Sequence, residues 1–178
     1  DGFFQIRTES GELQYTRDGS FEISPVANGN MLCTSDGNPV LDAYGNQIIL
    51  PSNRVATDLV VNQDGTLAFP DGTGNPAVIT DANGRPVKFG IYQFNNPAGL
   101  SKEGSNNYSV TVASGAAVAE NGNAAVKQTK THQYYTEASN VDVANEMVNL
   151  IVAQRAYEMN SKAIQASDEM MQQANALR

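Results

Sequence analysis

The chain has 178 residues, of which 40% are hydrophobic and 17% charged, enough for one packed domain or one domain with an appendage. Its formal net charge of −8 disfavours nucleic acids and anionic membranes as partners, because both require clustered lysine and arginine side chains. The single cysteine, Cys33, excludes an intrachain disulfide and is expected to be a small buried hydrophobic group.

The N-terminal residues, DGFFQIRTES, have no methionine and begin in the manner of a β-strand. They contain neither the basic nor the apolar region of a secretory leader. The sequence also lacks an apolar run near the ~18 residues of a membrane-spanning helix. We therefore expect that the chain begins inside a longer protein.

Residues 1–137 are dominated by turn signals, in which glycine is paired with a small polar residue. Such pairs supply the positive φ that tight hairpin turns require. The pairs are Asp18-Gly19, Asp36-Gly37, Gly45-Asn46, Asp64-Gly65, Asp71-Gly72, Asn83-Gly84 and Asn121-Gly122.

Short β-favouring runs lie between these turns, for example at residues 3–7, 47–50, 58–61, 66–69, 86–94 and 108–112. Val87, Phe89 and Ile91 alternate as a half-buried strand requires. Many short strands with frequent turns are typical of an antiparallel sandwich or a barrel. The sequence therefore predicts a mainly β fold, an antiparallel β-sandwich or irregular β-barrel over residues 1–137, followed by one long C-terminal amphipathic α-helix within residues 138–178.

Three segments of the β domain lack strand character. Residues 97–103 and 114–123 are expected to be longer loops. Residues 127–136, KQTKTHQYYT, are expected to be a polar extended segment, part of a linker near 124–137 that leads into the helix.

The predicted helix has capping residues at its N-terminus and no helix-breaking residue within it. Ser139 and Asn140 are both suitable N-caps, and Asp142 and Glu146 follow where the helix dipole favours acidic side chains. Neither glycine nor proline occurs from there to the end. A helix over residues 141–177 would be about 55 Å long.

Apolar side chains recur along this helix with a coiled-coil period. Alternate steps of four and three from Val143 give Met147, Leu150, Gln154, Tyr157, Ser161, Ile164, Asp168 and Met171. A neighbouring row contains Val148, Val152, Ala156, Met159, Ala163, Ala166 and Met170, and the two rows together predict a wide apolar stripe. The candidate polymer interface comprises Val141, Val143, Met147, Val148, Leu150, Ile151, Gln154, Tyr157, Met159, Ile164 and Met171.

No second helix in the sequence is available to cover this stripe. A β domain of this size is roughly 35–40 Å across, so the stripe would extend beyond it. An isolated helix is marginally stable in water. We therefore expect the helix to pack on partners outside this chain.

Candidate catalytic and metal-binding residues are sparse. His132 is the only histidine and lies in a polar stretch, where we expect it to face solvent or to bond locally. One histidine and one cysteine cannot form a zinc site without carboxylates. The sequences NQDGT and DGTGN lack the spacing of a calcium loop and are explained as turns. We assign no catalytic, cofactor-binding or metal-binding residue and expect no cofactor and no small-molecule substrate.

Both ends of the chain resemble the bacterial flagellar rod and hook proteins. The motif residues at the front are Gly2, Phe3 and Phe4, followed by Tyr15, Thr16, Arg17, Asp18, Gly19, Ser20 and Phe21. At the back, the runs Ser139-Asn140-Val141-Asp142 and AQRAYEMN (153–160) are similar to the C-terminal segment of that family. Two departures are Tyr134 and Thr136, where the family pattern has glycine and leucine. The family's upstream helical segment is also absent from this sequence.

The resemblance implies a structural, non-enzymatic subunit that polymerises into a hollow helical shaft and transmits torque from motor to hook. It further implies type III export, a location in the basal body outside the cytoplasmic membrane, and contacts with other rod proteins and the hook protein. In Gram-negative cells the P and L ring proteins would be additional partners, and the location would be the periplasm. In Gram-positive cells it would be the cell-wall region.

Several alternatives remain open. The amino-acid sequence of the helix favours a distal rod protein, but a proximal rod or hook protein of the same family is an alternative. A β-rich binding or adhesion module with an oligomerising helix would instead form a small oligomer with a ligand pocket. A hydrolase with scattered carboxylates would need a pair of acids with raised pKa in a deep cleft.

Overall fold

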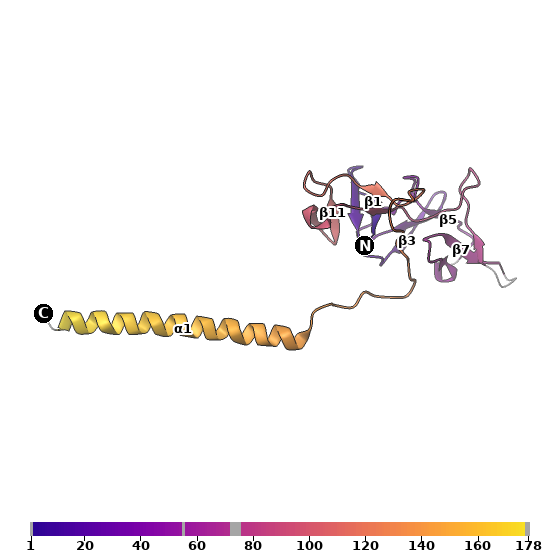
Figure 1. Ribbon diagram of the computed structural model, residues 1–178. Coiled ribbons are helices and arrows are strands. Elements are labelled where there is room, and N and C mark those ends of the chain that lie inside the picture. Colours follow the sequence, from indigo (N-terminus) through magenta and orange to yellow (C-terminus); the bar gives the residue numbers. More distant parts are fainter. Residues whose placement is uncertain (1, 55, 72–75, 177–178) are drawn as a thin grey trace. The chain divides into compact units, whose positions relative to one another are not determined.

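A computed structural model describes residues 2–54, 56–71 and 76–176 (Figure 1). It divides the chain into two compact units, Asp1–Tyr135 and Thr136–Arg178. The first contains all the strands and is called the β unit below, and the second contains the helix α1. The division lies close to residue 137, where the sequence analysis places the end of the β domain.

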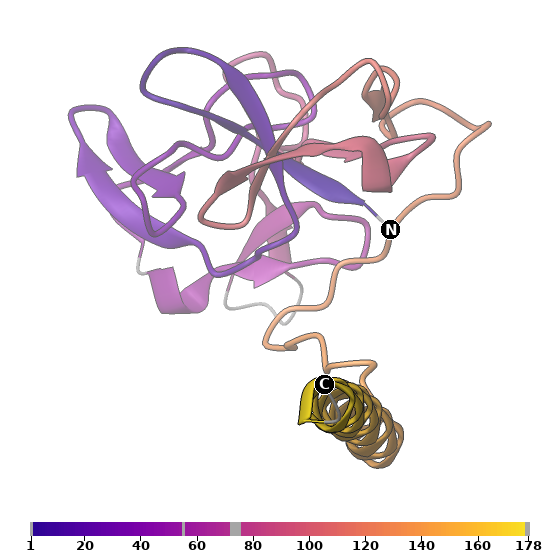
Figure 2. The ribbon, with the colours of Figure 1, turned by 90° about the vertical axis from the view of Figure 1, so that its left-hand side faces the viewer.

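The largest sheet of the β unit has six strands. Figures 1 and 2 show the β unit from two directions. Their order across the sheet is β10 (Ser101–Gly104), β11 (Asn107–Ser109), β2 (Leu13–Thr16), β1 (Phe3–Arg7), β9 (Ile91–Gln93) and β12 (Val118–Ala119). Each neighbouring pair is antiparallel, with Phe4 opposite Thr16 and Phe3 opposite Tyr92. The strand β1 lies near the middle of this sheet and contributes side chains to apolar clusters on both of its faces.

Two smaller antiparallel sheets complete the β unit. One contains β3 (Glu22–Val26), β4 (Gly29–Cys33) and β5 (Ile49–Leu50), and the other contains β6 (Val60–Val61), β7 (Leu67–Pro70) and β8 (Pro76–Val78). Short 3-10 turns, η1 (Ala56–Asp58) and η2 (Pro97–Gly99), precede β6 and β10. The predicted mainly antiparallel β fold followed by one long helix is confirmed, and the three sheets form no closed barrel within the residues described.

Two apolar clusters lie on the two faces of β1. Ile6 is fully buried in the larger cluster, against which the partly buried Phe4 packs. Phe3 faces the smaller, mostly aromatic cluster, and its ring centroid lies 5.4 Å from that of Phe94. The larger cluster comprises Ile6, Leu32, Val40, Ile48, Leu50, Leu59, Leu67, Phe69, Val87, Phe89 and Ile91, which come from all three sheets and the segments between them.

The glycine turns follow the sequence prediction at most positions. Gly37, Gly45, Gly65, Gly84 and Gly122 all have φ between 74° and 84°. Gly19 does not have a positive φ, because the Asp18 carboxylate forms the turn by accepting the backbone N–H of Ser20 (2.9 Å). The predicted turn at Asp71-Gly72 involves Gly72, which lies outside the described residues.

Strand positions were predicted less accurately than the β class. Residues 3–7 form β1 as predicted, whereas only residues 49–50 of 47–50 and 60–61 of 58–61 form strands. Residues 86–94 are interrupted, with isolated bridges at Pro86, Lys88 and Phe89 before β9 begins. Two expected loops contain strands, β10 in 97–103 and β12 in 114–123. These are the edge strands of the large sheet, and an edge strand needs no apolar alternation.

The helix α1 spans Val143–Ala176 and begins later than predicted. Asp142 is the N-cap, because its Oδ1 accepts the backbone N–H of Ala144 (3.0 Å). The predicted caps Ser139 and Asn140 lie before the helix, and Oγ of Ser139 accepts the N–H of Val141 instead (3.2 Å). Leu177, the predicted end, lies outside the described residues. None of the helices described is both long and apolar enough to cross a membrane.

Candidate assembly surface

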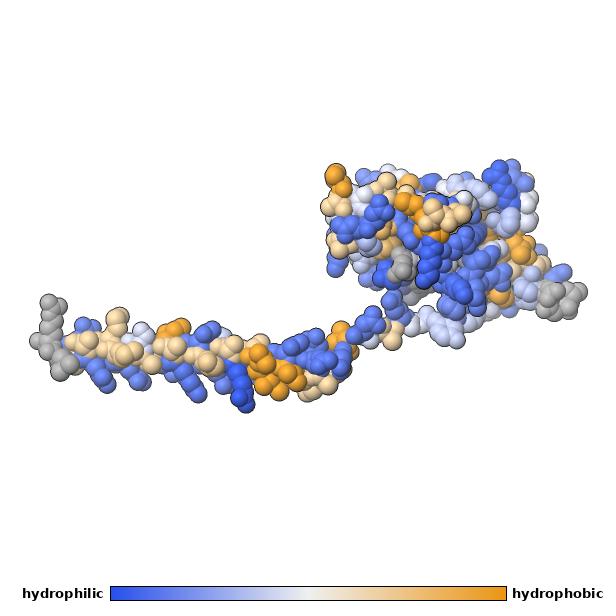
Figure 3. Space-filling model, viewed as in Figure 1, coloured by the Kyte–Doolittle hydropathy of each residue, from blue (hydrophilic) through white to orange (hydrophobic). Residues whose placement is uncertain are grey.

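The apolar side chains that the sequence assigns to the polymer interface are all exposed, in α1 and, for Val141, just before it. No described residue of α1 is buried. Exposed fractions reach 69% for Val143, 58% for Leu150 and 64% for Ile164, and Gln154 is also exposed. Figure 3 shows these apolar residues along the helix, with the most hydrophobic ones near its start. Substitutions of these exposed residues can therefore test whether they form an interface.

The two predicted rows do not merge into a single stripe. Successive residues of an α-helix are ~100° apart, so Leu150 of the first row and Val152 of the second lie about 200° apart around the axis. The helix therefore has two apolar sides, which lie nearly opposite each other. Such an arrangement suits a helix with neighbours on two sides rather than one.

Residues 147–153 are apolar almost all the way around the helix. Their sequence is MVNLIVA, in which Asn149 is the only polar residue. The exposed fractions are 62% for Met147, 51% for Ile151 and 61% for Val152. A helix that is apolar all round is normally buried. This segment is the strongest indication that α1 becomes enclosed by other molecules.

The front motif folds into one structural unit of the large sheet. The ring centroids of Phe4 and Phe21 are 5.2 Å apart, and the guanidinium carbon of Arg17 lies 5.7 Å from the ring centroid of Phe3. Thr16 Oγ1 donates to the carbonyl of Asn106 (2.9 Å). Tyr15 is buried at 5% exposure. The aromatic residues of the motif thus pack in the core, while residues 17–20 are exposed beside them. Ser139, Asn140 and Val141 lie in the separate segment that leads to α1.

Gly2 is required by close packing rather than by its backbone conformation. A Cβ atom at this position would lie 2.5 Å from Cγ2 of Ile91 and 2.7 Å from Oγ1 of Thr129. Both distances are shorter than real Cβ contacts, so any larger residue would displace its neighbours. The family motif thus includes a glycine over which Thr129, far away in the sequence, is packed.

Residues 127–133 form a strap across the β unit that the sequence analysis described only as a polar extended segment. Thr129, Thr131 and Gln133 are partly buried and bonded to the body, whereas Lys130 and His132 are exposed. The alternation of hydroxyl and amide side chains at every second position was the available signal. It was missed because a half-buried strand is normally recognised by apolar alternation.

The entry to the helix contains a backbone conformation that suits glycine. Tyr134 has a φ of 64°, in the left-handed region. The family pattern has glycine at this position, and Tyr134 keeps the glycine-type backbone with a side chain that is 87% exposed. Tyr134 therefore occupies a backbone position that glycine would adopt without a steric cost.

The histidine and the cysteine lie apart from any cluster capable of chemistry. His132 is exposed, and its ring centroid lies 5.6 Å from that of Tyr135. Cys33 is buried as predicted, its thiol donates to the carbonyl of Glu22 (3.5 Å), and burial raises the pKa of the thiol. Across the ranges described, no group of three or more His, Cys, Asp and Glu residues is placed to hold a metal ion.

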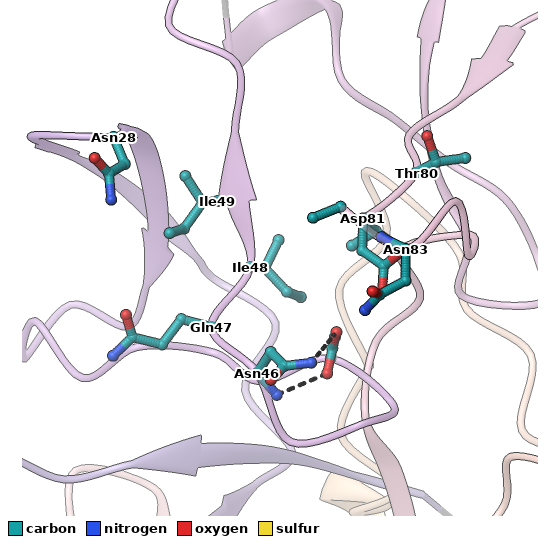
Figure 4. A pocket seen from close by; sticks show the side chains of 11 residues that line it. Asn28, Asn46, Gln47, Ile48, Ile49, Thr80, Asp81 and Asn83 are labelled. Carbon is teal, nitrogen blue, oxygen red and sulfur yellow. Dashed lines mark hydrogen bonds between the residues drawn. The ribbon is translucent and has the colours of Figure 1, made fainter.

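A hollow of about 560 Å³ lies between residues 46–49 and 80–83 (Figure 4). The carboxylates that line it accept hydrogen bonds from backbone N–H groups of adjacent turns. Asp42 Oδ1 accepts the backbone N–H groups of Tyr44 and Asn46, both at 2.8 Å. Asp81 Oδ1 accepts those of Asn83 and Arg85, which hold the pKa of Asp81 below its usual value. The lowered pKa of Asp81 is the opposite of the raised pKa that the hydrolase alternative requires of an acid.

Both ends of the chain match described flagellar families. Residues 1–69 match the family described as "Flagellar hook protein FlgE/F/G D1 domain". Residues 132–177 match the family described as "Flagellar basal body rod FlgEFG protein C-terminal". These matched segments contain the front and back motifs.

Similar curated proteins extend the likeness across the chain. The flagellar basal-body rod protein FlgG of Borreliella burgdorferi is 39% identical, over 100% of this chain and 62% of that protein. FlgG of Bacillus subtilis is 37% identical, over 97% of this chain and 61% of its own length. The flagellar hook-basal body complex protein FlhP of Bacillus subtilis is also 37% identical, over 95% and 59%. This chain thus spans about three fifths of the length of these relatives.

Proposed function

Because this chain belongs to the family of flagellar hook and basal-body rod proteins, we propose that it is part of a structural, non-enzymatic rod subunit. The subunit polymerises into a hollow helical shaft, in the distal rod, that transmits torque from motor to hook. The observation that carries this proposal is the exposed segment 147–153, which is apolar on nearly all sides.

Burial of the apolar side chains of α1 favours assembly. Enclosing the apolar side chains of the first row would contribute on the order of 10 kcal/mol, and leaving them in water forfeits that stabilisation. An isolated helix of this kind is marginal. Two opposite apolar sides favour neighbours on both, as in a shaft built from several layers of helices.

The composition of α1 fits close packing against non-identical neighbours. Ala153, Ala156 and Ala163 allow helices to approach closely, and flexible side chains such as Met147 and Met159 adapt to different surroundings. A heterologous contact that does not close into a ring generates a helical polymer. We therefore retain as the polymer interface the eleven side chains that the sequence analysis assigns to it.

The partners follow from the same proposal. The chain contacts further copies of itself, other rod proteins and the hook protein, and the P and L ring proteins in a Gram-negative cell. It resides in the basal body outside the cytoplasmic membrane, in the periplasm or in the cell-wall region according to cell type. No nucleic acid and no small-molecule substrate take part.

The decisive experiment places a charge on the apolar surface of the full-length protein. Ile151→Asp or Ile164→Asp is expected to abolish rod assembly, because a buried carboxylate without a partner is costly. The β unit should remain folded, since neither residue belongs to its core. Electron microscopy of basal bodies and a swimming assay provide the readout.

Asn149→Asp is the matched control. It adds the same charge two residues from Ile151, at the one polar position of the apolar segment, and rods should still form. Normal rods in cells carrying either isoleucine substitution would contradict the proposal. A small closed oligomer of the wild-type protein, with no filament, would favour the binding-module alternative.

The position along the axis requires a separate measurement. One relative at 37% identity is named a hook-basal body complex protein rather than FlgG, which keeps the proximal rod and the hook as second candidates. Immunogold labelling of purified hook-basal bodies distinguishes them. Label confined to the distal rod supports the assignment, and label on the hook or near the membrane contradicts it.

A further inference from the structure

The strap, residues 127–133, is attached to the β unit by the side chains of three residues, Thr129, Thr131 and Gln133. It is not paired as a β-strand. At the first of these residues, the N–H of Thr129 donates to Oε2 of Glu120 (2.7 Å), and Oγ1 of Thr129 donates to Oε1 (2.6 Å). Glu120 is 5% exposed and also accepts Nε2 of Gln93 (2.7 Å). Its carboxylate therefore ties the strap to β9, the strand that contains Gln93.

The other two residues tie the strap to a different sheet. The N–H of Thr131 donates to the carbonyl of Gln63 (3.0 Å), and its Oγ1 donates to that of Asn62 (2.6 Å). Gln133 accepts the N–H of Val61 (3.0 Å) and donates to the carbonyl of Leu59 (2.7 Å). These partners lie in or beside β6, so the strap bridges the six-stranded sheet and the sheet of β6, β7 and β8.

The strap contributes little to the apolar core. None of its residues belongs to either apolar cluster, and hydrogen bonds to polar groups hold Thr129, Thr131 and Gln133 in place. Loss of these bonds should therefore detach the strap without unfolding the sheets. The strap is also the last segment of the β unit, which ends at Tyr135.

We propose that Thr129, Thr131 and Gln133 are positioning residues that fix the point at which the chain leaves the β unit. This second step rests on the proposed rod function. When the shaft of α1 helices rotates, the fixed exit point makes each β unit rotate together with its helix. With the strap detached, the link would begin near Glu120, and the β unit would swing on a longer tether.

The test compares two sets of substitutions of similar size in the full chain. Thr129→Val, Thr131→Val and Gln133→Leu together remove the side-chain bonding groups while keeping the shapes of the side chains, and leave only backbone groups of these residues to bond. Thr129→Ser with Thr131→Ser keeps both hydroxyls and serves as the control. Both sets should retain the far-ultraviolet circular dichroism of the wild type, which shows that the sheets remain folded.

The first readout concerns the isolated chain. Hydrogen exchange at the amides of Val61, Thr129 and Thr131 should be at least about tenfold faster in the triple variant, and unchanged in the control. Spin labels at Lys102→Cys and Tyr135→Cys, with Cys33→Ala, should give a narrow distance distribution that broadens in the triple variant. Equal exchange rates and equally narrow distributions would overturn the proposed hold of the strap, as would a wild-type distribution already as broad as that of the triple variant.

The second readout concerns the polymer. Filaments of the full-length triple variant should keep an ordered helical core but show β units averaged out in a helical reconstruction. β units as well ordered as in the wild type would overturn the coupling. If the wild-type protein forms no filament, the proposed rod function fails, while the exchange and distance measurements still decide whether the strap fixes the exit of the chain.

Discussion

At the scale of single residues, the two glycines of the front motif meet different requirements. Gly2 lies beneath Ile91 and Thr129, so we expect Gly2→Ala to lower the free energy of unfolding of the β unit by about 1–3 kcal/mol. Gly19 has only a ring atom of Phe4 at 3.8 Å from its Cβ position and has no positive φ. Urea unfolding of both variants measures the difference.

Gly19→Ala is the control for that prediction and should change stability by no more than about 0.5 kcal/mol. Equal losses in the two variants would show that Gly2 is not specifically constrained by packing. A loss confined to Gly2→Ala would show that the packing of Ile91 and Thr129 over Gly2 constrains this position.

Tyr134 provides a second prediction, based on its backbone conformation. A left-handed φ destabilises a residue that has a side chain by roughly 1–2 kcal/mol. Glycine removes this steric strain, but its greater conformational entropy in the unfolded chain offsets part of the gain. We expect Tyr134→Gly to stabilise the β unit by about 0.5–1 kcal/mol in thermal or urea unfolding. Tyr135→Gly, an 81% exposed neighbour without a positive φ, should give no gain, and a similar gain there would exclude relief of backbone strain as the cause.

Asp64 predicts a dependence of stability on pH. The hydroxyl of Thr66 donates to Oδ2 of Asp64 (2.6 Å), and this bond, assisted by the Thr66 N–H and by Lys88, holds the pKa of Asp64 below its ordinary value of 3.8. Because the folded pKa is depressed, the stabilisation is present above the unfolded value and is lost as the pH falls through the folded value. Urea unfolding should therefore show stability decreasing below about pH 4.

Two substitutions isolate that contribution. The stability difference between the wild type and Asp64→Asn should be constant near neutral pH and shrink in acid, because protonation removes the charge from the wild type as well. Thr66→Val removes the main cause of the lowered pKa and should flatten the pH dependence. Parallel pH profiles for the wild type and Asp64→Asn would contradict the role of Asp64.

At the scale of secondary-structure elements, the predictable strands were those with apolar alternation or a fixed turn beside them. Residues 3–7 and most of 66–69 are strands in the structure because their side chains fill the core. Residues 101–104, SKEG, form β10 although all of them are exposed. They pair with β11 across the two-residue turn of Ser105 and Asn106, which both have a positive φ. This strand was missed because its exposed residues have no apolar alternation.

The start of α1 illustrates the same limit on prediction and can be tested directly. Three suitable caps, Ser139, Asn140 and Asp142, follow one another closely, and the structure selects Asp142. We expect Asp142→Ala to reduce helix stability by about 1 kcal/mol, seen as a smaller circular dichroism signal at 222 nm in the full chain. Ser139→Ala should leave that signal unchanged, and a larger loss from Ser139→Ala than from Asp142→Ala would contradict this assignment.

At the scale of the whole molecule, the sequence predicted two parts of different character, and the candidate site belongs almost entirely to one of them. The apolar residues of α1 could be identified in advance because a continuous helix has a fixed geometry. The strap showed only an alternation of polar side chains. The groups that Glu120, Thr131 and Gln133 bind, which belong to Gln93, Asn62 and Leu59 respectively, are far away in the sequence. Long-range polar contacts of this kind require the fold before they can be seen.

The contrast between the two units leads to the last prediction, which concerns their unfolding. The β unit has a buried core, whereas α1 has no buried residue in a single chain. Heating should therefore give two transitions, an early and gradual loss of signal at 222 nm from α1 and a later cooperative one from the β unit. Near-ultraviolet circular dichroism separates them, since Tyr15 packs against Tyr92 and Phe94 in the β unit while Tyr157 on α1 is 78% exposed.

Protein concentration should affect only the first of these transitions. If copies of α1 associate, their melting temperature rises with concentration, because binding stabilises the associated state by mass action. Ile151→Asp should abolish that rise without moving the later transition, and Asn149→Asp should preserve it. A single transition detected equally at both wavelengths, independent of concentration, would mean that α1 is stabilised within its own chain and that its apolar sides are not available for assembly.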